Sequence, residues 1–377
     1  MNRSSITFSS MSPALKVVEI TNNPVPYRVP IYNRVARDPR LHMTHIFSII
    51  QEPGRFTDLP PFEFQHVLLK PNYRSRDDHN VHNNRDVWGV LRHLQPDVVI
   101  TDGFNPTSLY GFLYARFFGK KHIPMTDGSY DSEQALSWKH KWVRRLVYSG
   151  SQAFIGASNG SRALYASYGI DVQRHFFQSH LCVDNARFDL GRGDRSYDVV
   201  FCSRLVDGKR PLFALDVCSR AAVKLGRRVK ALFVGAGPLE AALRERVAQV
   251  QGVAATVHGF GMQADLPALY NQGRVFLFPT AGDVWGVVIN EACASGLAVM
   301  STPYAGVVGE LVRDGENGHV IDFDVERWAT ALADLLTDET RLRQFGLRSR
   351  QLVQAYSYDA AAKGLVDAAR HAAGCAS

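Results

Sequence analysis

The sequence predicts an α/β protein in which two Rossmann-like, doubly wound domains face each other across a cleft. Short continuous apolar runs alternate with segments of helical periodicity, and this alternation occurs twice along the 377 residues. Continuous apolar strands separated by helices are typical of parallel sheets covered on both faces. A polar stretch at residues 189–198 is expected to link the two halves. Ligands of such sheets bind at the carboxyl ends of the strands, so the cleft is the expected site.

The individual elements follow from these patterns. The expected buried strands of the first half cover residues 16–20, 96–100, 122–126 and 152–158, and those of the second half cover 198–204, 230–235, 253–259, 275–280 and 298–302. Apolar residues at helical spacing predict helices over 239–250 and 328–336. We therefore expect a disordered leader at 1–14, with translation starting at Met1 or Met11, a first domain at 15–190, a second at 191–355 and a terminal helix in 356–377.

Composition excludes several classes of protein. Apolar residues make up 46% and charged residues 21%, which excludes a disordered chain, and no apolar run has the roughly 20 residues of a membrane-spanning helix. The five cysteines are widely spaced and never form C-x-x-C, which indicates reduced thiols, a cytoplasmic protein and no zinc site. The net charge of +7 is concentrated in residues 1–190, which hold 22 basic and 16 acidic residues. An anionic partner is expected there, and nucleic acid ranks last because no recognition motif accompanies the charge.

Two loops at predicted strand ends suit phosphate chemistry. Arg204 leaves one strand and Lys209 follows on the same loop, and two cations so placed can each engage one phosphoryl group of a diphosphate. Gly235 begins a Gly-Ala-Gly-Pro turn after the next strand. A dinucleotide fingerprint would require a third glycine where Glu240 stands, so a nicotinamide cofactor is excluded.

Residues 279–296 form the most informative stretch. Asp283 and Glu291 flank Gly286, and a helix is expected to begin near Val287 or Val288 and to end before Gly296. The backbone N–H groups of residues 286–288 would then face a phosphate in the cleft. Glu291, one turn into the helix, could accept hydrogen bonds from a ribose diol, and Asp283 could bind sugar hydroxyls.

In this order, the motifs R-x-x-x-x-K, G-x-G-P, D-x-W-G-x-x-x-x-E-A, A-G-x-x-x-E-L and D-G-x-N-G resemble those of the retaining glycosyltransferases of family four (group 1), which share the GT-B fold. The resemblance covers residues 195–360 well and implies that Arg204 and Lys209 bind the diphosphate, Asp283 the sugar and Glu291 the ribose. It also implies donor contacts at Gly235, Phe260, Trp285, Gly286, Val287 and Val288. The final helix is similar to one that crosses back to the first domain.

The first half resembles the family less closely. A P-Y-R-x-P variant of its first loop makes Tyr27 and Arg28 acceptor-side candidates. Asp127 stands where many members carry a histidine beside the transferred sugar, and it either orients a sugar hydroxyl or caps a turn. The segment 137–150 reads as a basic amphipathic helix with tryptophan at its edge, which suits either an anionic lipid surface or packing against the core.

The resemblance implies a retaining hexosyltransferase that moves a sugar from a UDP- or GDP-sugar to a lipid-linked or polysaccharide acceptor in bacterial exopolysaccharide or lipopolysaccharide synthesis. It would work without metal or other cofactor, in the cytoplasm or peripherally on the inner face of the plasma membrane. Three alternatives remain open: a non-catalytic nucleotide-sugar-binding subunit, a sugar-nucleotide epimerase, and a serine hydrolase. The last rests on Ser158, in a G-x-S-x-G pattern between strand and helix, with Asp283 and His319 or His371 later in the chain. The competing explanation is that Ser158 caps the following helix.

Overall fold

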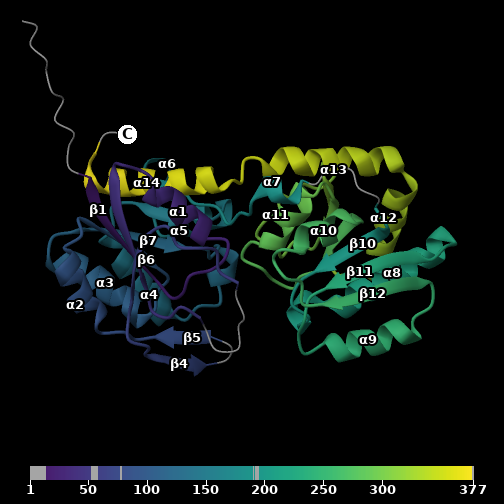
Figure 1. The fold of residues 1–377 in the computed structure, drawn as a ribbon, viewed down its shortest axis with the longest axis horizontal. Helices are drawn as coiled ribbons and strands as arrows, with labels where there is room; N and C mark the ends of the chain where they lie inside the picture. The colour runs from purple at the N-terminus through teal and green to yellow at the C-terminus, as the bar shows by residue number, and fades with distance from the viewer. Residues whose placement is uncertain (1–13, 52–57, 77–78, 190, 192–194, 376–377) are drawn as a thin grey trace, which may run out of the picture.

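The computed structural model describes residues 14–51, 58–76, 79–189, 191 and 195–375. The expected leader and both candidate initiator methionines lie outside the described residues, apart from Ala14 at the end of the leader. Two α/β domains lie side by side, as Figure 1 shows, which confirms the predicted fold class. Within the described part of the chain, no helix is both long enough and apolar enough to cross a bilayer.

The first domain is built on a seven-stranded sheet with the order β3-β2-β1-β6-β7-β8-β9, and every neighbouring pair is parallel. Its central strands are buried on both faces because helices cover both sides of the sheet; Val98, Val99 and Ile100 of β6 are fully buried. The strands are β1 (Leu15–Thr21), β2 (Leu41–Phe47), β3 (Gln65–Leu68), β6 (Val98–Asp102), β7 (Lys121–Thr126), β8 (Phe154–Gly156) and β9 (Phe176–Gln178).

Helices α1 (Val29–Ala36), α2 (Val87–Leu94), α3 (Pro106–Phe117), α4 (Trp138–Ser149), α5 (Asn159–Ser167) and α6 (Val172–His175) belong to this domain, as does the short 3-10 helix η1 (Asp131–Glu133). An antiparallel hairpin of β4 (Tyr73–Arg76) and β5 (His79–His82) lies apart from the main sheet. The strand order reverses at β1, between β2 and β6, so the carboxyl ends of β1, β6 and β7 border the ligand-binding edge of the sheet.

The second domain contains a six-stranded parallel sheet with the order β12-β11-β10-β13-β14-β15. Its strands are β10 (Tyr197–Cys202), β11 (Val229–Val234), β12 (Val253–Gly259), β13 (Gly273–Phe278), β14 (Ala298–Ser301) and β15 (Gly318–Val320). Its helices are η2 (Asp207–Lys209), α8 (Pro211–Leu225), α9 (Glu240–Gln249), α10 (Leu266–Asn271), α11 (Val287–Ala294), α12 (Val325–Thr337) and α13 (Glu339–Val353). Helix α11 begins and ends as the sequence predicts, with Gly296 in the left-handed region just beyond its end.

The chain passes between the domains twice. The last helix, α14 (Tyr358–Ala373), packs on α1 and on strands β6 to β9 of the first domain, as Figure 1 shows in yellow. The first crossing lies earlier than the expected boundary at residue 191. Helix α7 (Asn185–Phe188) already packs on α10 and α11 of the second domain, and the Phe188 carbonyl accepts a hydrogen bond from Asn271. The crossing therefore lies between β9 and α7.

Candidate active site

A cleft of about 730 Å³ lies between the two domains. Ser129, Asp131 and Asn159 line it from the first domain, and Asp283 and Glu310 line it from the second. These residues follow the carboxyl ends of strands in both sheets, which is where open parallel sheets bind ligands. Three of the sequence motifs, around residues 127–131, 279–286 and 304–310, thus come together on opposing walls.

The loop that carries Arg204 is fixed by the glycine turn of the next strand. The backbone N–H groups of Ser203 and Leu205 donate to the carbonyls of Val234 and Ala236, at 3.0 and 2.9 Å. A Cβ atom on Gly235 would lie 1.9 Å from the Ser203 carbonyl oxygen, so only glycine allows the two loops to run this close. The Arg204 side chain is exposed and pairs with no acidic side chain among the described residues. Gly235 therefore acts by placing Arg204.

Phe260 stands beside the same turn. Gly259, which precedes it, accepts a hydrogen bond of 2.6 Å from the backbone N–H of Gly235. The Phe260 side chain is 57% exposed. An exposed aromatic ring next to a phosphate-type loop is placed where a nucleoside base could stack on it.

Lys209 and Asp283 come together across two loops. The Nζ atom of Lys209 lies 2.6 Å from Oδ2 of Asp283 and also donates to Oγ1 of Thr280 at 3.2 Å. The same ammonium lies 5.4 Å from the centre of the Phe278 ring. Both side chains of the pair are partly accessible. Lys209, which is expected to bind the diphosphate, and Asp283, which is expected to bind the sugar, are therefore in direct contact.

Helix α11 points its N-terminus toward this pair. Gly286 has a φ of +96° and precedes the helix, and a Cβ there would lie 3.0 Å from the Phe278 ring. The backbone N–H groups of Gly286, Val287 and Val288 donate to no acceptor in the described part of the chain. Three free N–H groups at a helix N-terminus, near a lysine, form an anion-binding geometry.

Trp285 departs from its expected role. Its side chain is fully buried, its indole N–H donates to Oδ1 of Asn290 at 2.9 Å, and its ring packs against Tyr356. A buried indole supports the loop by packing inside the domain, and it exposes no surface to the cleft. The expectation of a donor contact is therefore wrong for this side chain.

Glu291 lies deeper than the sequence indicates. It is buried on α11, and its Oε2 atom has no hydrogen-bond partner among the described residues. Burial raises the pKa of its carboxyl to about 7, against a smaller lowering by the Tyr270 hydroxyl. A buried carboxylate oxygen without a partner is costly, and a hydroxylic ligand would offset that cost.

The first-domain candidates form a charged cluster at the ends of β6 and β7. Nη2 of Arg28 donates to Oδ1 of Asp127 at 2.8 Å, and Nη1 donates to Oγ of Ser179 at 3.0 Å. Arg28 is buried in this network, so it positions Asp127 instead of contacting an acceptor as expected. Asp127 itself is 31% exposed.

Tyr27 and Asp102 complete the cluster. Burial, followed by the negative charge of Asp127, raises the pKa of Tyr27, and Asp283 adds to this from the second domain. Asp102, at the end of β6, accepts a hydrogen bond from Thr21, and burial together with the charge of Asp127 raises the pKa of its carboxyl to about 7. Sequence analysis missed Asp102. The signal that could have found it is its position, since an acidic residue at the end of an apolar strand lies at the ligand-binding edge of a parallel sheet.

Glu310 is the second residue that sequence analysis missed as a cleft residue. Its Oε1 atom accepts a hydrogen bond of 2.7 Å from the backbone N–H of Asn159, in the opposite domain. Burial raises the pKa of its carboxyl. Its local sequence indicated only a turn, because a contact between two domains leaves no local pattern.

Ser158 caps α5. Its Oγ atom accepts a hydrogen bond from the backbone N–H of Ser161, and the side chain is buried. His371 pairs with His175, and His319 lies beside Asp314, so neither histidine is placed as a base for Ser158. The hydrolase alternative is not favoured.

Comparison with known proteins agrees with this geometry. Residues 196–338 match the family model described as glycosyl transferases group 1. A protein of Mycolicibacterium smegmatis is 39% identical over 270 residues, which cover 65% of this chain and 68% of that protein. It is named GDP-mannose-dependent alpha-(1-6)-phosphatidylinositol monomannoside mannosyltransferase. A D-inositol 3-phosphate glycosyltransferase of Rhodococcus opacus is 32% identical over 50% of this chain and 44% of its own length. The chain thus spans less than half the length of the D-inositol 3-phosphate glycosyltransferase.

Solved structures share the fold over nearly the whole chain. HepE of Anabaena in complex with UDP has a TM-score of 0.69 at 14% identity and covers 94% of this chain and 98% of its own. The pneumococcal O-GlcNAc transferase GtfA in complex with UDP and GlcNAc has the same TM-score at 13% identity, over 95% and 99%. Motif order, fold and the extended match to the mannosyltransferase agree: the chain belongs to the group 1 glycosyltransferases.

Proposed function

We propose that this protein transfers a hexose from a nucleoside diphosphate sugar to a hydroxyl of a lipid-linked or saccharide acceptor, with retention of anomeric configuration. The single observation that carries the proposal is the Lys209–Asp283 pair near the free N–H groups of residues 286–288, with exposed Arg204 on the loop that leads to Lys209. A solved structure of the same fold is in complex with UDP, and the mannosyltransferase relative is named for GDP-mannose; both support a UDP- or GDP-sugar as the donor in this proposal.

The groups of the second domain would stabilise the leaving diphosphate. Arg204 is exposed and without an acidic partner among the described residues, so it can swing to a phosphoryl group without breaking an ion pair. Lys209 can exchange Asp283 for a phosphate and leave that carboxylate free for sugar hydroxyls. Preorganised cations and N–H groups aimed at developing charge are the largest contribution in such transfers.

Retention follows in this proposal from attack on the face that the diphosphate leaves. The charge of Asp283 acts on Tyr27 of the first-domain cluster, so the acceptor would enter on the side of Tyr27, Asp102 and Asp127. Glu291 would hold the ribose diol through its unpartnered oxygen. We propose that no divalent metal takes part; loss of turnover with a chelator and recovery with Mn²⁺ would overturn this.

The acceptor side also carries a surface suited to an anionic membrane. On α4, Trp138, Trp142 and Leu146 are 72%, 59% and 46% exposed and lie on one face, while Val147 packs on the core. Helix α3 packs near α4 through Phe112 and has two exposed apolar side chains of its own, Leu113 and Phe117, of which Phe117 lies beside Trp88 of α2. We call Trp138, Trp142 and Leu146 of α4 the apolar stripe.

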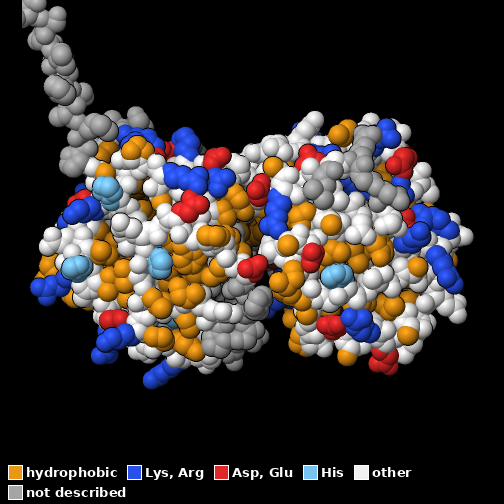
Figure 2. Space-filling view, in the orientation of Figure 1, with side chains coloured by type: hydrophobic (Ala, Val, Ile, Leu, Met, Phe, Trp, Pro, Cys, Tyr) orange, Lys and Arg blue, Asp and Glu red, His pale blue; other side chains and the backbone are white. Residues whose placement is uncertain are grey.

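Figure 2 shows hydrophobic side chains gathered over the part of the first domain where Figure 1 places α3 and α4. Exposed Lys139, Arg145 and Arg116 surround the stripe, and α4 contains no acidic residue. Exposed tryptophan beside cationic residues is the pattern of helices that lie in a membrane interface. We propose peripheral binding to the inner face of the plasma membrane.

Thermal unfolding with nucleotides tests the donor site. UDP or GDP at about 100 times its dissociation constant should add roughly 2.7 kcal/mol to the free energy of unfolding, whereas NAD should add nothing. Arg204→Ala and Lys209→Ala should lose this stabilisation and also lose sugar transfer. Arg228→Ala removes another exposed arginine, which lies at the amino end of β11 and so away from the carboxyl ends of the strands, and it should keep both. Nucleotide binding without any transfer would favour the non-catalytic alternative, and donor turnover without acceptor would favour the epimerase.

A further inference from the structure

A second cavity lies in the first domain, away from the interdomain cleft. Its volume is about 880 Å³, and it opens between the C-terminal ends of α4 and α14, helix α6 and the start of β7. It is therefore at the amino end of the β7 strand, whereas the cleft is at the carboxyl end. None of the residues assigned to donor or acceptor binding lines it.

Four basic side chains and one acidic side chain line this cavity, beside uncharged polar groups. The charged, titratable and hydroxyl side chains that matter here are Lys121, Ser149, Asp171, Arg174, His175 and His371. Lys121 and Arg174 form no ion pair with any residue in the described ranges. Asp171 caps α6 by accepting a hydrogen bond from the backbone N–H of Gln173. Lys121 and Arg174 therefore border the cavity without an ion-pair partner among the described residues, and Asp171 is the one acidic residue in its described lining.

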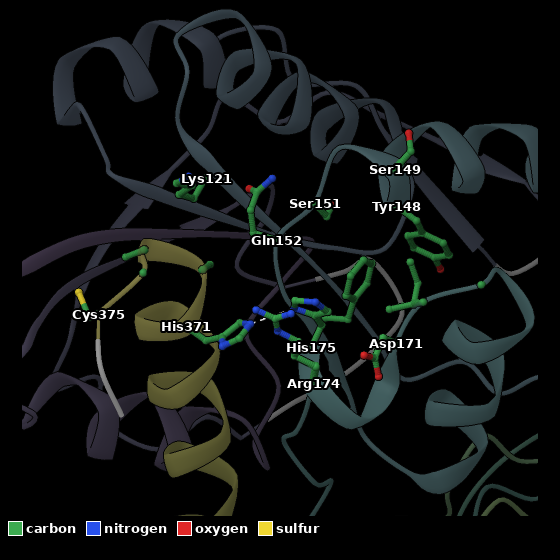
Figure 3. Close-up of a pocket in the computed structure, with 16 residues that line it drawn as sticks. Lys121, Tyr148, Ser149, Ser151, Gln152, Asp171, Arg174, His175, His371 and Cys375 are labelled. Atoms are coloured by element: carbon green, nitrogen blue, oxygen red, sulfur yellow. Dashed lines mark hydrogen bonds between the residues drawn. The ribbon is translucent and has the colours of Figure 1, made fainter.

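Two histidines from distant parts of the chain meet in this cavity. Nδ1 of His175 lies 2.9 Å from Nε2 of His371, and Figure 3 shows this contact beside Arg174. A single proton between these two nitrogens is enough for the hydrogen bond. The other nitrogen of each imidazole ring can therefore donate a hydrogen bond to a ligand when that nitrogen is protonated. Burial, followed by the positive charges of His175 and Arg174, lowers the pKa of His371. An anion would relieve this repulsion.

The cavity adjoins the apolar stripe. Ser149 lines it and lies on α4 three residues beyond Leu146, so the exposed face of Trp138, Trp142 and Leu146 runs toward its rim. When the stripe rests in a membrane interface, the cavity is therefore brought to the depth of lipid headgroups.

We propose that this cavity is a binding site for a phosphate group, held by Lys121, Arg174 and the His175–His371 pair. Guanidinium and ammonium groups together with imidazolium N–H donors form charge-assisted hydrogen bonds to phosphate oxygens. The phosphate can belong to an anionic lipid headgroup or to a soluble phosphate ester, and the position beside the stripe favours the lipid. The site is separate from the cleft, so it does not depend on the proposed transfer reaction.

The phosphate arm of the test uses the full chain and inorganic phosphate. The imidazole C2–H resonances of His175 and His371, assigned through His175→Gln and His371→Gln, should shift and saturate on titration. In the double variant Lys121→Gln/Arg174→Gln the apparent dissociation constant should rise about a hundredfold, since each charge-assisted hydrogen bond changes affinity by about tenfold or more. Arg228→Gln/Lys230→Gln, which removes two exposed charges from the second domain, should leave it unchanged. Histidine resonances that do not respond, or that respond equally in both double variants, would overturn the proposal.

The lipid arm compares vesicles of phosphatidylcholine with and without phosphatidylglycerol. If the ligand is a headgroup, Lys121→Gln/Arg174→Gln should weaken binding to anionic vesicles about thirtyfold, at about fivefold per basic side chain, and the control pair should not. If vesicle binding is unchanged while glycerol 3-phosphate still requires Lys121 and Arg174, the site stands and its ligand is a soluble ester. All these surface variants should keep the nucleotide-dependent thermal shift, so failure here is distinguishable from failure of the donor site.

Discussion

The Oε1 atom of Glu310 lies 2.7 Å from the backbone nitrogen of Asn159, so a carboxylate of the second domain caps α5 of the first. Ser158 caps the same helix from within its own domain by accepting from Ser161. The helix N-terminus thus has one local and one interdomain partner. Because the Glu310 contact exists only while the two domains adjoin, it favours the closed arrangement of the cleft.

Glu310→Ala should shift the molecule toward a more open arrangement. Loss of a carboxylate cap costs about 1 kcal/mol, which lowers the closed-to-open equilibrium constant about fivefold and lowers kcat/KM by at most about that factor. Small-angle scattering should show a larger radius of gyration, with an unchanged melting curve for each domain. Glu316→Ala is the matched control, since Glu316 pairs with Arg348 within the second domain. Equal radii for both variants would contradict the capping role.

Glu291 should make stability depend on pH. Its pKa is about 7 in the folded protein against an ordinary glutamate pKa of 4.5, so folding takes up a proton between these two values. The stability associated with the protonated carboxyl is present below pH 4.5 and is lost as pH rises to about 7, by roughly 3 kcal/mol in all. Glu291→Gln should therefore be more stable than the parent at pH 8 and similar to it at pH 4.5, as measured by denaturant unfolding. A constant difference across this range would refute the assignment.

Gly235→Ala should destabilise the second domain and weaken nucleotide binding together. The added Cβ would meet the Ser203 carbonyl oxygen at 1.9 Å, at a φ of +143° that alanine rarely adopts. We expect a loss of about 2 kcal/mol or more in the free energy of unfolding. Gly89→Ala, in α2, adds the same methyl where nothing lies within 4 Å and should be neutral or slightly stabilising. Chemical unfolding of both variants checks this, and equal stabilities would show that the two loops can separate.

Trp138→Ser/Trp142→Ser should weaken sedimentation with anionic vesicles while leaving nucleotide-induced stabilisation intact. Each tryptophan is more than half exposed, so its removal takes no contact from the core. The control is Val223→Ser, which replaces an apolar residue that is 72% exposed on α8 of the other domain. Unchanged vesicle binding in the tryptophan variant would contradict the membrane role of the stripe.

The nine strands expected from sequence all exist, and most of them are buried on both faces, as their continuous apolar runs indicate. The expectation of burial is wrong for β12, an edge strand whose residues alternate between half-buried and exposed. Strand β2 was missed because His42, Thr44 and His45 interrupt its apolar run, yet Thr44 and His45 are buried. Strands β9 and β15 are three residues long, too short for any periodicity to appear. Tertiary pairing alone places them at the sheet edges.

Parts of the site could be predicted where they depend on the spacing of residues within one continuous strand, loop and helix. The start of α11 at Val287 and the cap at Ser158 follow from such local patterns. Trp285 and Arg28 were assigned to ligands because the motifs that contain them resemble those of the family. Their burial depends on Asn290 and on Asp127, and the pairing of Arg28 with Asp127 joins residues 99 positions apart. Only the assembled fold decides such pairings.

Asn185 bears on how the domains can move. Its side-chain Nδ2 donates to the carbonyls of Val353 and Tyr356, at 3.0 and 3.2 Å, and so ties the two crossings of the chain to each other. Two connections held at one place act as a single hinge axis, which permits rotation of one domain against the other but resists sliding or separation. Opening for substrate exchange is then a swing about Asn185, largest at the far rim of the cleft and smallest beside the crossings.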